Sequence, residues 1–304
     1  MTENTVRSAE RRRSVTIALL AAMRPRQWTK NLVVLSPLLF SRHFFELDVV
    51  LRSLAAFALF SLTASAIYLF NDVVDLNKDR EHPVKRHRPI ASGELPIPVA
   101  LTAFALLTVL CGVCAFFLSP TFFAVIAAYF VLNVVYTVTL KETVIIDVMA
   151  ISASFLLRIV GGACAIHVPL SEWLLICASL LALFLGFSKR RHELTLLEAN
   201  ATAHRPVLEE YNTYFLDQMI SLVTASTLIG YILYTVSPDT VEKFGSKNLL
   251  WTVPFVLYGL FRYLYLVHQK KTGGDPTAEL LTDWPLLLNV FLWAVSVMIV
   301  ISFP

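Results

Sequence analysis

Three carboxylates, those of Asp72, Asp75 and Asp79, occur close together with the amide of Asn71 in residues 71–79. On a helix, side chains three and four residues apart lie on one face. Three carboxylates on one face repel one another unless a cation joins them or water surrounds them. Mg²⁺ prefers one or two carboxylates together with phosphate oxygens of a substrate. We therefore predict that the three aspartates form a catalytic Mg²⁺ site with Asn71 contacting substrate; the alternative is a solvated helix end.

A strongly basic segment follows directly, with cations at Lys85, Arg86 and Arg88. Basic residues often flank membrane spans on the cytoplasmic side, but that tendency does not explain their density next to the carboxylates. Carboxylates that hold a metal, beside cations that face phosphate oxygens, are typical of a diphosphate site. We predict that these three residues bind the substrate.

The pattern Asn71-Asp72-x-x-Asp75-x-x-x-Asp79, followed by residues 88–93 (RPIASG), resembles the first acidic motif of the UbiA superfamily of intramembrane prenyltransferases. The resemblance implies nine transmembrane helices and a cytoplasmic N-terminus. Typical members carry a second Asp-x-x-x-Asp motif after the sixth helix, which binds another Mg²⁺. The corresponding segment here departs from that pattern and has the sequence Lys189-Arg190-Arg191-His192-Glu193. Such a segment suits a phosphate that arrives with fewer metal ions; the alternative is a basic flank of the sixth span.

Four segments resemble one branch of this superfamily, the decaprenyl-phosphate phosphoribosyltransferases. They are residues 24–31 (RPRQWTKN), which contain Lys30, 82–89 (HPVKRHRP), 155–162 (FLLRIVGG) and 189–194 (KRRHEL). The resemblance implies transfer of a phosphoribosyl group from 5-phosphoribosyl diphosphate to a polyprenyl phosphate, with loss of diphosphate. The product would be a precursor of cell-wall arabinose donors. Lys30, Lys189, Arg190 and Glu193 are expected to contact the substrates.

The residue types agree with that reaction. Mg²⁺ would stabilise the leaving diphosphate, and cleavage at the anomeric carbon would develop oxocarbenium character. A lipid phosphate is already an anion, so it needs positioning and charge cancellation rather than a strong general base.

Two charged residues, Asp147 and Arg158, fall inside one apolar segment. Their separation of eleven residues corresponds to about 16 Å along a helix and places them on one face. Charged groups in a span usually face the bundle interior or a wet cavity. We expect Asp147 near the cytoplasmic site and Arg158 deeper, both contacting substrate; the alternative for each is an ion pair between helices. Tyr136 and Lys141, which end the preceding span, are loosely similar to a Tyr–Lys pair of the superfamily and are expected to bind substrate, Lys141 through a phosphate; the alternative for Lys141 is that it only marks the membrane boundary.

The elements that position these residues must be membrane helices. The chain has 304 residues, of which 57% are hydrophobic and only 15% charged, whereas about a quarter are charged in soluble domains. This composition excludes a disordered protein, a coiled coil and a disulfide-stapled secreted module. A membrane helix needs about 20 apolar residues. We predict an all-α, UbiA-like polytopic bundle with nine spans, at residues 28–45, 49–70, 97–118, 120–140, 144–165, 170–188, 215–236, 249–267 and 284–303.

The distribution of cations predicts the orientation. Nineteen of the 25 Lys and Arg residues fall in the N-terminal segment and the loops on its side of the membrane, and four fall on the opposite side. This split predicts a cytoplasmic N-terminus and active site in a bacterial-type cytoplasmic membrane, with the C-terminus outside. Residues 1–27 are expected to form a cytoplasmic tail with an interfacial amphipathic helix, and residues 28–304 a single catalytic domain. No nucleic-acid partner is expected, and homo-oligomerisation stays open.

Two other functions remain open from the sequence. The first is transfer of a polyprenyl group from its diphosphate to an aromatic or quinone-precursor acceptor, as in most of the superfamily; the missing second Asp-x-x-x-Asp motif is the objection. The second is transport of an anionic solute, which Asp147 and Arg158 would support. The absence of paired broken helices in the sequence pattern disfavours transport.

Overall fold

The computed structural model describes residues 14–41, 43, 45–199, 206–270, 279–280 and 282–302, and within these ranges it contains helices and no strand. The α-helices are α1 (Val15–Ala22), α2 (Ser36–Leu39), α3 (Leu47–Val74), α4 (Leu76–Glu81), α5 (Ile97–Leu118), α6 (Pro120–Val138), α7 (Ile146–Ile166), α8 (Glu172–Ala199), α9 (Thr213–Val236), α10 (Pro238–Phe244), α11 (Val253–His268) and α13 (Trp284–Ser302). The 3₁₀ helices are η1 (Pro25–Leu35), η2 (Lys85–His87), η3 (Leu140–Glu142), η4 (Pro206–Glu210) and η5 (Asn248–Thr252).

Eight helices of the described residues are long and apolar enough to cross a membrane. They coincide with eight of the nine predicted spans, so the all-α membrane fold is confirmed. Two of them extend beyond the predicted apolar segments at their polar ends. Helix α3 continues through Asp72 to Val74, and α8 continues through Arg190 and Glu193. Asp72, Arg190 and Glu193 therefore lie on helix ends rather than in loops.

The first predicted span has a different structure. Residues Pro25–Leu35 form a 3₁₀ helix, followed by the four-residue helix α2, and Arg42 and Phe44 lie outside the described residues. Nine long apolar helices are therefore not confirmed. The polar residues that open this segment bond to α3, because Trp28 Nε1 donates to Ser65 Oγ at 3.0 Å and Asn31 Nδ2 to Ser61 Oγ at 3.1 Å. The later residue of the first segment, Asn31, bonds to the earlier residue of α3, Ser61, so the segment and α3 run antiparallel.

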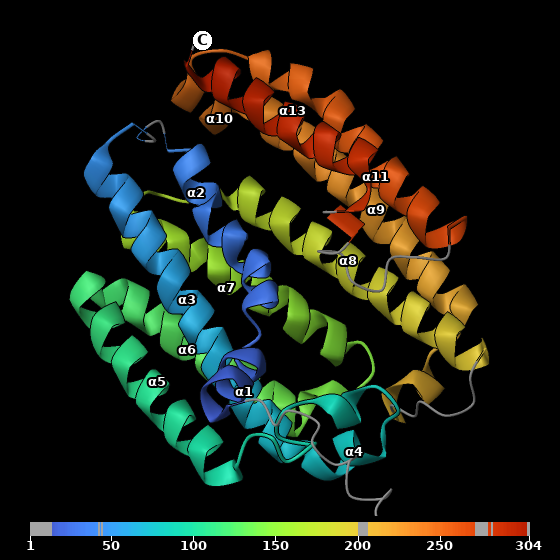
Figure 1. The fold of residues 1–304 in the computed structure, drawn as a ribbon. Coiled ribbons are helices and arrows are strands. Elements are labelled where there is room, and N and C mark those ends of the chain that lie inside the picture. The colour runs from blue at the N-terminus through green and yellow to red at the C-terminus, as the bar shows by residue number, and fades with distance from the viewer. Residues whose placement is uncertain are drawn as a thin grey trace, which may run out of the picture.

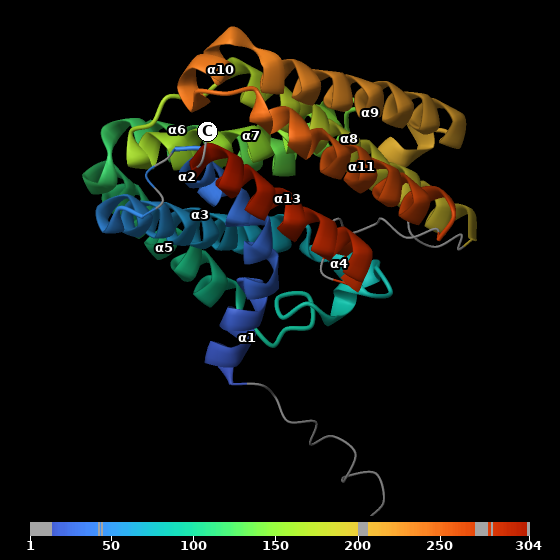
Figure 2. The ribbon, with the colours of Figure 1, turned by 90° about the horizontal axis from the view of Figure 1, so that it is seen from above.

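The long helices form two packed groups. Helices α3, α5 and α6 lie on one side and α8, α9, α11 and α13 on the other, with α7 between them (Figure 1; Figure 2 shows the same grouping from above). Aromatic side chains fill both interiors. Phe60 packs edge-on against Phe122 and Tyr129 in the first group, and Phe184 against Tyr263 in the second. Helix α7 packs on both groups, so its side chains can reach both.

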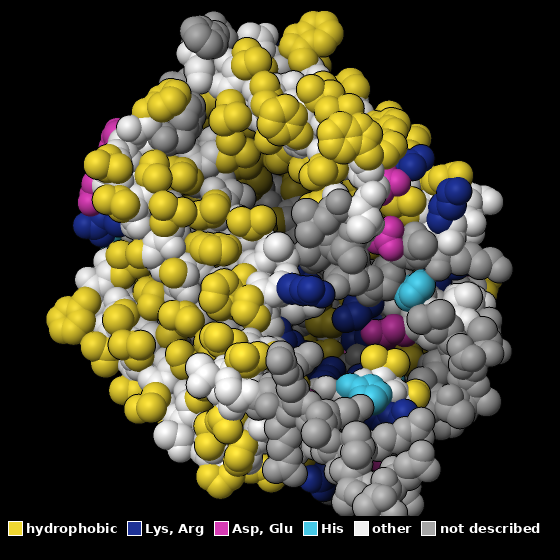
Figure 3. Space-filling model, viewed as in Figure 1, with side chains coloured by type: hydrophobic (Ala, Val, Ile, Leu, Met, Phe, Trp, Pro, Cys, Tyr) yellow, Lys and Arg dark blue, Asp and Glu magenta, His cyan; other side chains and the backbone are white. Residues whose placement is uncertain are grey.

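The surface is divided by polarity. Most of the face in Figure 3 is hydrophobic, whereas Lys, Arg, Asp, Glu and His side chains gather towards the end of the molecule where α4 lies. Many large apolar side chains are exposed on the long helices, including Phe117, Leu222 and Phe291. An apolar belt of this kind requires lipid around it.

The predicted interfacial helix corresponds in part to α1. Ala18 and Ala22 on this helix are buried, whereas Val15, Ile17 and Leu20 are about half exposed. The helix Val15–Ala22 carries no charged side chain, and residues 1–13 lie outside the described residues. Its amphipathic character stays a prediction.

Candidate active site

The carboxylates lie where α3 gives way to α4. Helix α3 ends at Val74 and α4 begins at Leu76, with Asp75 between them. The helical hydrogen-bond spacing nevertheless continues, since Asp75 N donates to Asn71 O at 2.9 Å and Asp79 N to Asp75 O at 2.8 Å. The spacing read from the sequence therefore holds across the junction.

One guanidinium joins two of the carboxylates. Arg88 Nη1 donates to Asp72 Oδ1 at 3.0 Å and to Asp79 Oδ2 at 2.7 Å. Both carboxylates are buried, with side-chain exposures of 1% and 3%. A second guanidinium, from Arg24 at the end of α1, also donates to Asp72 Oδ1. The sequence predicts Arg88 as a substrate-binding residue, and that role stays a prediction, whereas the sequence does not single out Arg24.

The third carboxylate faces another element. Lys141 Nζ in η3 lies 2.6 Å from Asp75 Oδ1. Lys78 in α4 pairs with Glu142 in η3 at 2.9 Å, and this hydrogen bond raises the pKa of Lys78. Two ion pairs therefore attach the α3–α4 junction and α4 to η3, which follows α6.

The geometry fits a metal on two carboxylates better than on three. Within the described residues, no three His, Cys, Asp or Glu side chains are grouped closely enough to hold a metal ion. Asp72 and Asp79, however, both reach one cationic nitrogen, and Asp72 Oδ2 is buried without a hydrogen-bond partner. An unpaired buried carboxylate oxygen is costly, and two carboxylates plus substrate phosphates satisfy Mg²⁺. Asp72 and Asp79 fit Mg²⁺, and the assignment of Asp72, Asp75 and Asp79 as metal ligands stays a prediction.

A second charged cluster forms between α7 and α8. Arg190 Nε donates to Asp147 Oδ2 at 2.6 Å, Nη1 to Glu193 Oε2 at 2.5 Å and Nη2 to Tyr136 OH at 3.3 Å. The Arg190 side chain is only 1% exposed and Asp147 is fully buried. Arg190 thus faces two carboxylates rather than open space, and Asp147 forms the interhelical ion pair that the sequence left as an alternative.

Tyr211, which the sequence reading did not select, completes this cluster. Its hydroxyl donates to Asp147 Oδ1 at 2.8 Å and accepts from Ile145 N at 2.7 Å. Burial, with a contribution from Asp147, raises the pKa of Tyr211, so the phenol stays protonated as a donor. Both oxygens of Asp147 are therefore satisfied.

Arg158 lies in a separate network of neutral groups. Its guanidinium donates to Asn31 Oδ1 at 2.7 Å, to Tyr129 OH at 2.8 Å and to the Ser154 carbonyl at 2.8 Å. The side chain also lies over the Tyr129 and Phe155 rings. Among the described residues no carboxylate pairs with Arg158, and this network joins α6, α7 and η1. Contact with substrate stays a prediction.

The first cluster comprises Asp72, Asp75 and Asp79 with Arg24, Arg88 and Lys141, and the other predicted residues lie outside these ion pairs. Asn71 and Lys30 are half-buried, Lys85 and Arg86 are exposed on η2, and Arg86 Nε bonds to His87 at 3.3 Å. Lys189 Nζ lies 3.9 Å from Glu193 at the edge of the second cluster. Their substrate contacts stay predictions.

Hydrogen bonds to His82 stabilise the basic loop of residues 82–88. His82 Nδ1 accepts hydrogen bonds from Val84 N at 3.1 Å and Lys85 N at 3.2 Å, which requires an unprotonated nitrogen. Burial, helped by nearby cations, lowers the pKa of His82 and favours that neutral form.

Two residues of the site, Arg24 and Asn31, belong to the motif RPRQWTKN but are not predicted as site residues. Nothing in this motif indicates that Arg24 contacts Asp72, 48 residues away, or that Asn31 contacts Arg158, 127 residues away. Tyr211 and Tyr129 carried no signal, because aromatic residues are frequent throughout this chain.

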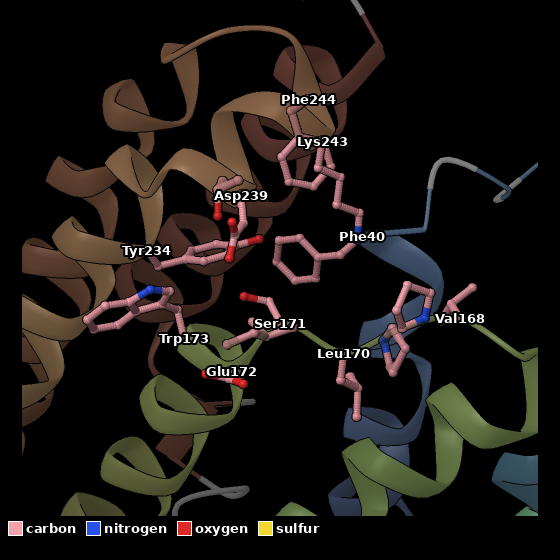
Figure 4. A pocket seen from close by; sticks show the side chains of 14 residues that line it. Phe40, Val168, Leu170, Ser171, Glu172, Trp173, Tyr234, Asp239, Lys243 and Phe244 are labelled. Atoms are coloured by element: carbon pink, nitrogen blue, oxygen red, sulfur yellow. The ribbon is translucent and has the colours of Figure 1, made fainter.

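A cavity of about 330 Å³ lies at the other end of the bundle, between the end of α2, the start of α8 and α10. Phe40, Tyr234 and Phe244 line it together with Asp239 and Lys243 (Figure 4). It contains none of the predicted site residues, so it is separate from the two clusters.

Comparisons with known proteins agree on the kind of protein. The pattern of the UbiA prenyltransferase family matches residues 32–295. The decaprenyl-phosphate phosphoribosyltransferase of Mycobacterium tuberculosis (strain CDC 1551 / Oshkosh) is 33% identical over 94% of each chain. That of Mycolicibacterium smegmatis (strain ATCC 700084 / mc(2)155) is 32% identical, over 96% of this chain and 95% of the relative.

The fold also matches solved structures. A UbiA homologue from Archaeoglobus fulgidus bound to GPP and Mg²⁺ superposes with a TM-score of 0.70 at 17% identity, covering 94% of this chain and 99% of that one. A structure of digeranylgeranylglyceryl phosphate synthase gives 0.65 at 17% identity, covering 95% and 99%.

Proposed function

This chain belongs to the UbiA prenyltransferase family, and on that premise we propose that it transfers a phosphoribosyl group from 5-phosphoribosyl diphosphate to a polyprenyl phosphate. The observation that carries the proposal is the replacement of a second metal-binding motif by the Lys189–Arg191 segment, in a chain one third identical to named phosphoribosyltransferases over 94% of its length. Arg190 and Arg191 are paired with carboxylates, so Lys189, whose side chain is 38% exposed, is the cation of this segment that favours an anionic lipid acceptor over a neutral aromatic one.

Arg88 and the carboxylates support the donor end of this reaction. Mg²⁺ held by Asp72 and Asp79 would supply charge neutralisation for the departing diphosphate. Arg88 already lies between these carboxylates, and Lys141 lies beside Asp75. Both cations are thus placed to donate charge-assisted hydrogen bonds to phosphate oxygens. We assign Asp72 and Asp79 to the metal and the two cations to the donor phosphates.

The end of α6 joins the donor and acceptor regions. Tyr136 bonds to Arg190 in the second cluster, while Lys141, five residues later, pairs with Asp75 in the first. A lipid phosphate held near Lys189 would therefore approach the donor along the end of α6. Its attack needs orientation more than proton removal, because the attacking oxygen is already ionised.

The segment of η1 and α2 supplies the ninth crossing in this proposal. Eleven residues of 3₁₀ helix rise about 2.0 Å each and the four residues of α2 about 1.5 Å each. Together they span about 28 Å, close to the hydrocarbon thickness of roughly 30 Å. Its antiparallel contacts with α3 support the same crossing. The basic end of the bundle, with both clusters, would then face the cytoplasm.

Sealed vesicles test the activity and the orientation together. Inside-out membrane vesicles from cells that express this chain should release diphosphate when the polyanionic donor is added outside with Mg²⁺ and incorporated polyprenyl phosphate. Right-side-out vesicles should release none until detergent is added, and vesicles without the chain should release none either before or after detergent. Release from right-side-out vesicles alone would reverse the orientation, and no release in detergent would refute the function.

A further inference from the structure

Arg24 has a backbone conformation that is rare for its residue type. Its φ of 55° and ψ of 60° lie in the left-handed region, which few residues other than glycine adopt. The residues on either side are anchored to α3 by one hydroxyl. Ser65 Oγ lies 2.9 Å from the carbonyl oxygens of both Met23 and Ser61, which share its one hydrogen, and accepts from Trp28 Nε1 at 3.0 Å. The backbone of Arg24 is therefore fixed against α3 despite its unfavourable conformation.

The side chain of Arg24 reaches the metal-binding carboxylates from this fixed point. Its guanidinium donates to Asp72 Oδ1 and lies 4.9 Å from the centre of the Tyr68 ring. The Arg24 side chain is 24% exposed, whereas Asp72 is 1% exposed. A molecule arriving at the site can reach the guanidinium without entering the bundle.

Among the residues that the structure describes, the charges of the first cluster balance without any ligand. Asp72, Asp75 and Asp79 pair with Arg24, Arg88 and Lys141. A divalent cation added alone would leave two excess positive charges among poorly solvated side chains, where such charges interact strongly. Diphosphate carries the opposite charge, and its oxygens accept strong hydrogen bonds from arginine.

We propose that Arg24 is a diphosphate-binding residue. In the free protein its guanidinium neutralises Asp72; when metal and diphosphate bind together, the guanidinium releases Asp72 and binds the phosphate oxygens instead. The side chain moves while the backbone stays anchored at Ser65. Metal and diphosphate therefore bind as a pair, and metal alone binds weakly. The inference rests on the proposed function only in taking diphosphate as the leaving group, which prenyl transfer would also release.

Calorimetric titration of the detergent-purified chain tests this inference. The probes are Mg²⁺ alone and preformed magnesium diphosphate, and the test variant is Arg24→Gln. Arg26→Gln is the matched control, because Arg26 is exposed, lies two residues away and forms no ion pair among the described residues. Both variants lose one positive charge, so a general electrostatic effect would appear in both.

The expected result has opposite signs for the two probes. Arg24→Gln should bind Mg²⁺ alone several-fold more tightly, because a competing cation has gone, and magnesium diphosphate roughly tenfold more weakly, because a charge-assisted hydrogen bond has gone. Arg26→Gln should change each affinity less than about twofold. Weaker binding of both probes to Arg24→Gln would indicate a structural role, and any other pattern would also overturn the proposal.

Two further measurements keep the result interpretable. The variant should elute as the folded protein in size-exclusion chromatography, because Arg88 still pairs with Asp72. Arg24→Lys, which keeps the charge, should restore weak binding of Mg²⁺ alone. Neither probe requires turnover, so Arg24→Gln could shift the two affinities in opposite directions even in a protein that does not transfer phosphoribose. Failure of the Arg24 proposal can therefore be distinguished from failure of the proposed function.

Discussion

The charged side chains of the second cluster satisfy one another before any substrate is present. Arg190 uses its three guanidinium nitrogens on Asp147, Glu193 and Tyr136, and Tyr211 takes the other oxygen of Asp147. A buried ion pair often adds little net stability, but removing one partner leaves an uncompensated buried charge. Arg190 therefore positions Glu193, whose carboxylate lies 3.9 Å from Lys189, the more exposed cation of this segment.

Arg190→Ala should consequently destabilise the fold by about 3–5 kcal/mol, because Asp147 stays buried without its partner. Lys189→Ala should change stability by about 0.5 kcal/mol or less, because its side chain is 38% exposed. Denaturation in detergent, followed by circular dichroism, measures both. Unchanged stability in Arg190→Ala together with weaker binding of a phosphorylated substrate would mean that Arg190 contacts that substrate directly.

At the scale of the elements, a close approach between two backbones fixes the first segment against α7. A Cβ added at Gly162 in α7 would lie 2.0 Å from the Val34 carbonyl oxygen in η1, whereas one at Gly112 in α5 would lie 3.7 Å from the nearest atom. Like the hydrogen bond from Arg158 to Asn31, this contact joins α7 to η1. Packing on α7 therefore holds in place the segment that also carries Arg24.

Gly162→Ala should destabilise the protein by about 2 kcal/mol or more, because backbone atoms must move apart. Gly112→Ala should be neutral or stabilising by up to about 1 kcal/mol, as expected for alanine in a helix. Thermal unfolding of the two variants in one detergent provides the comparison. Equal melting temperatures would contradict the close packing of η1 on α7.

The long helices could be predicted because apolar runs of about 20 residues have one structural solution in a membrane. The segment 97–118 was predicted with the bounds that α5 has. The 3₁₀ structure of the first segment could not be predicted, since its polar residues are satisfied by Ser61, Ser65 and Arg158 on other helices.

The candidate site could be predicted only in part. Helix geometry predicts the spacing of Asp72, Asp75 and Asp79, but no local pattern encodes the Arg24–Asp72 and Arg190–Asp147 pairs, 48 and 43 residues apart.

At the scale of the whole molecule, an apolar bundle carries its charged clusters towards one end. Helix α7 contributes Asp147 to the second cluster and packs against the segment that leads from Arg24. A donor dissolved in water and a lipid phosphate embedded in the membrane could therefore meet at the membrane boundary. The family fold alone does not specify this pair of substrates.

Mass spectrometry of the lipid product tests the phosphoribosyl-transfer proposal most directly. The purified chain is offered 5-phosphoribosyl diphosphate with a polyprenyl phosphate and, in a parallel reaction, a prenyl diphosphate with an aromatic acceptor, both with Mg²⁺. We predict a polyprenyl phosphate heavier by one phosphoribosyl group in the first reaction and no new product in the second. A prenylated aromatic product, with the polyprenyl phosphate unchanged, would contradict the proposal.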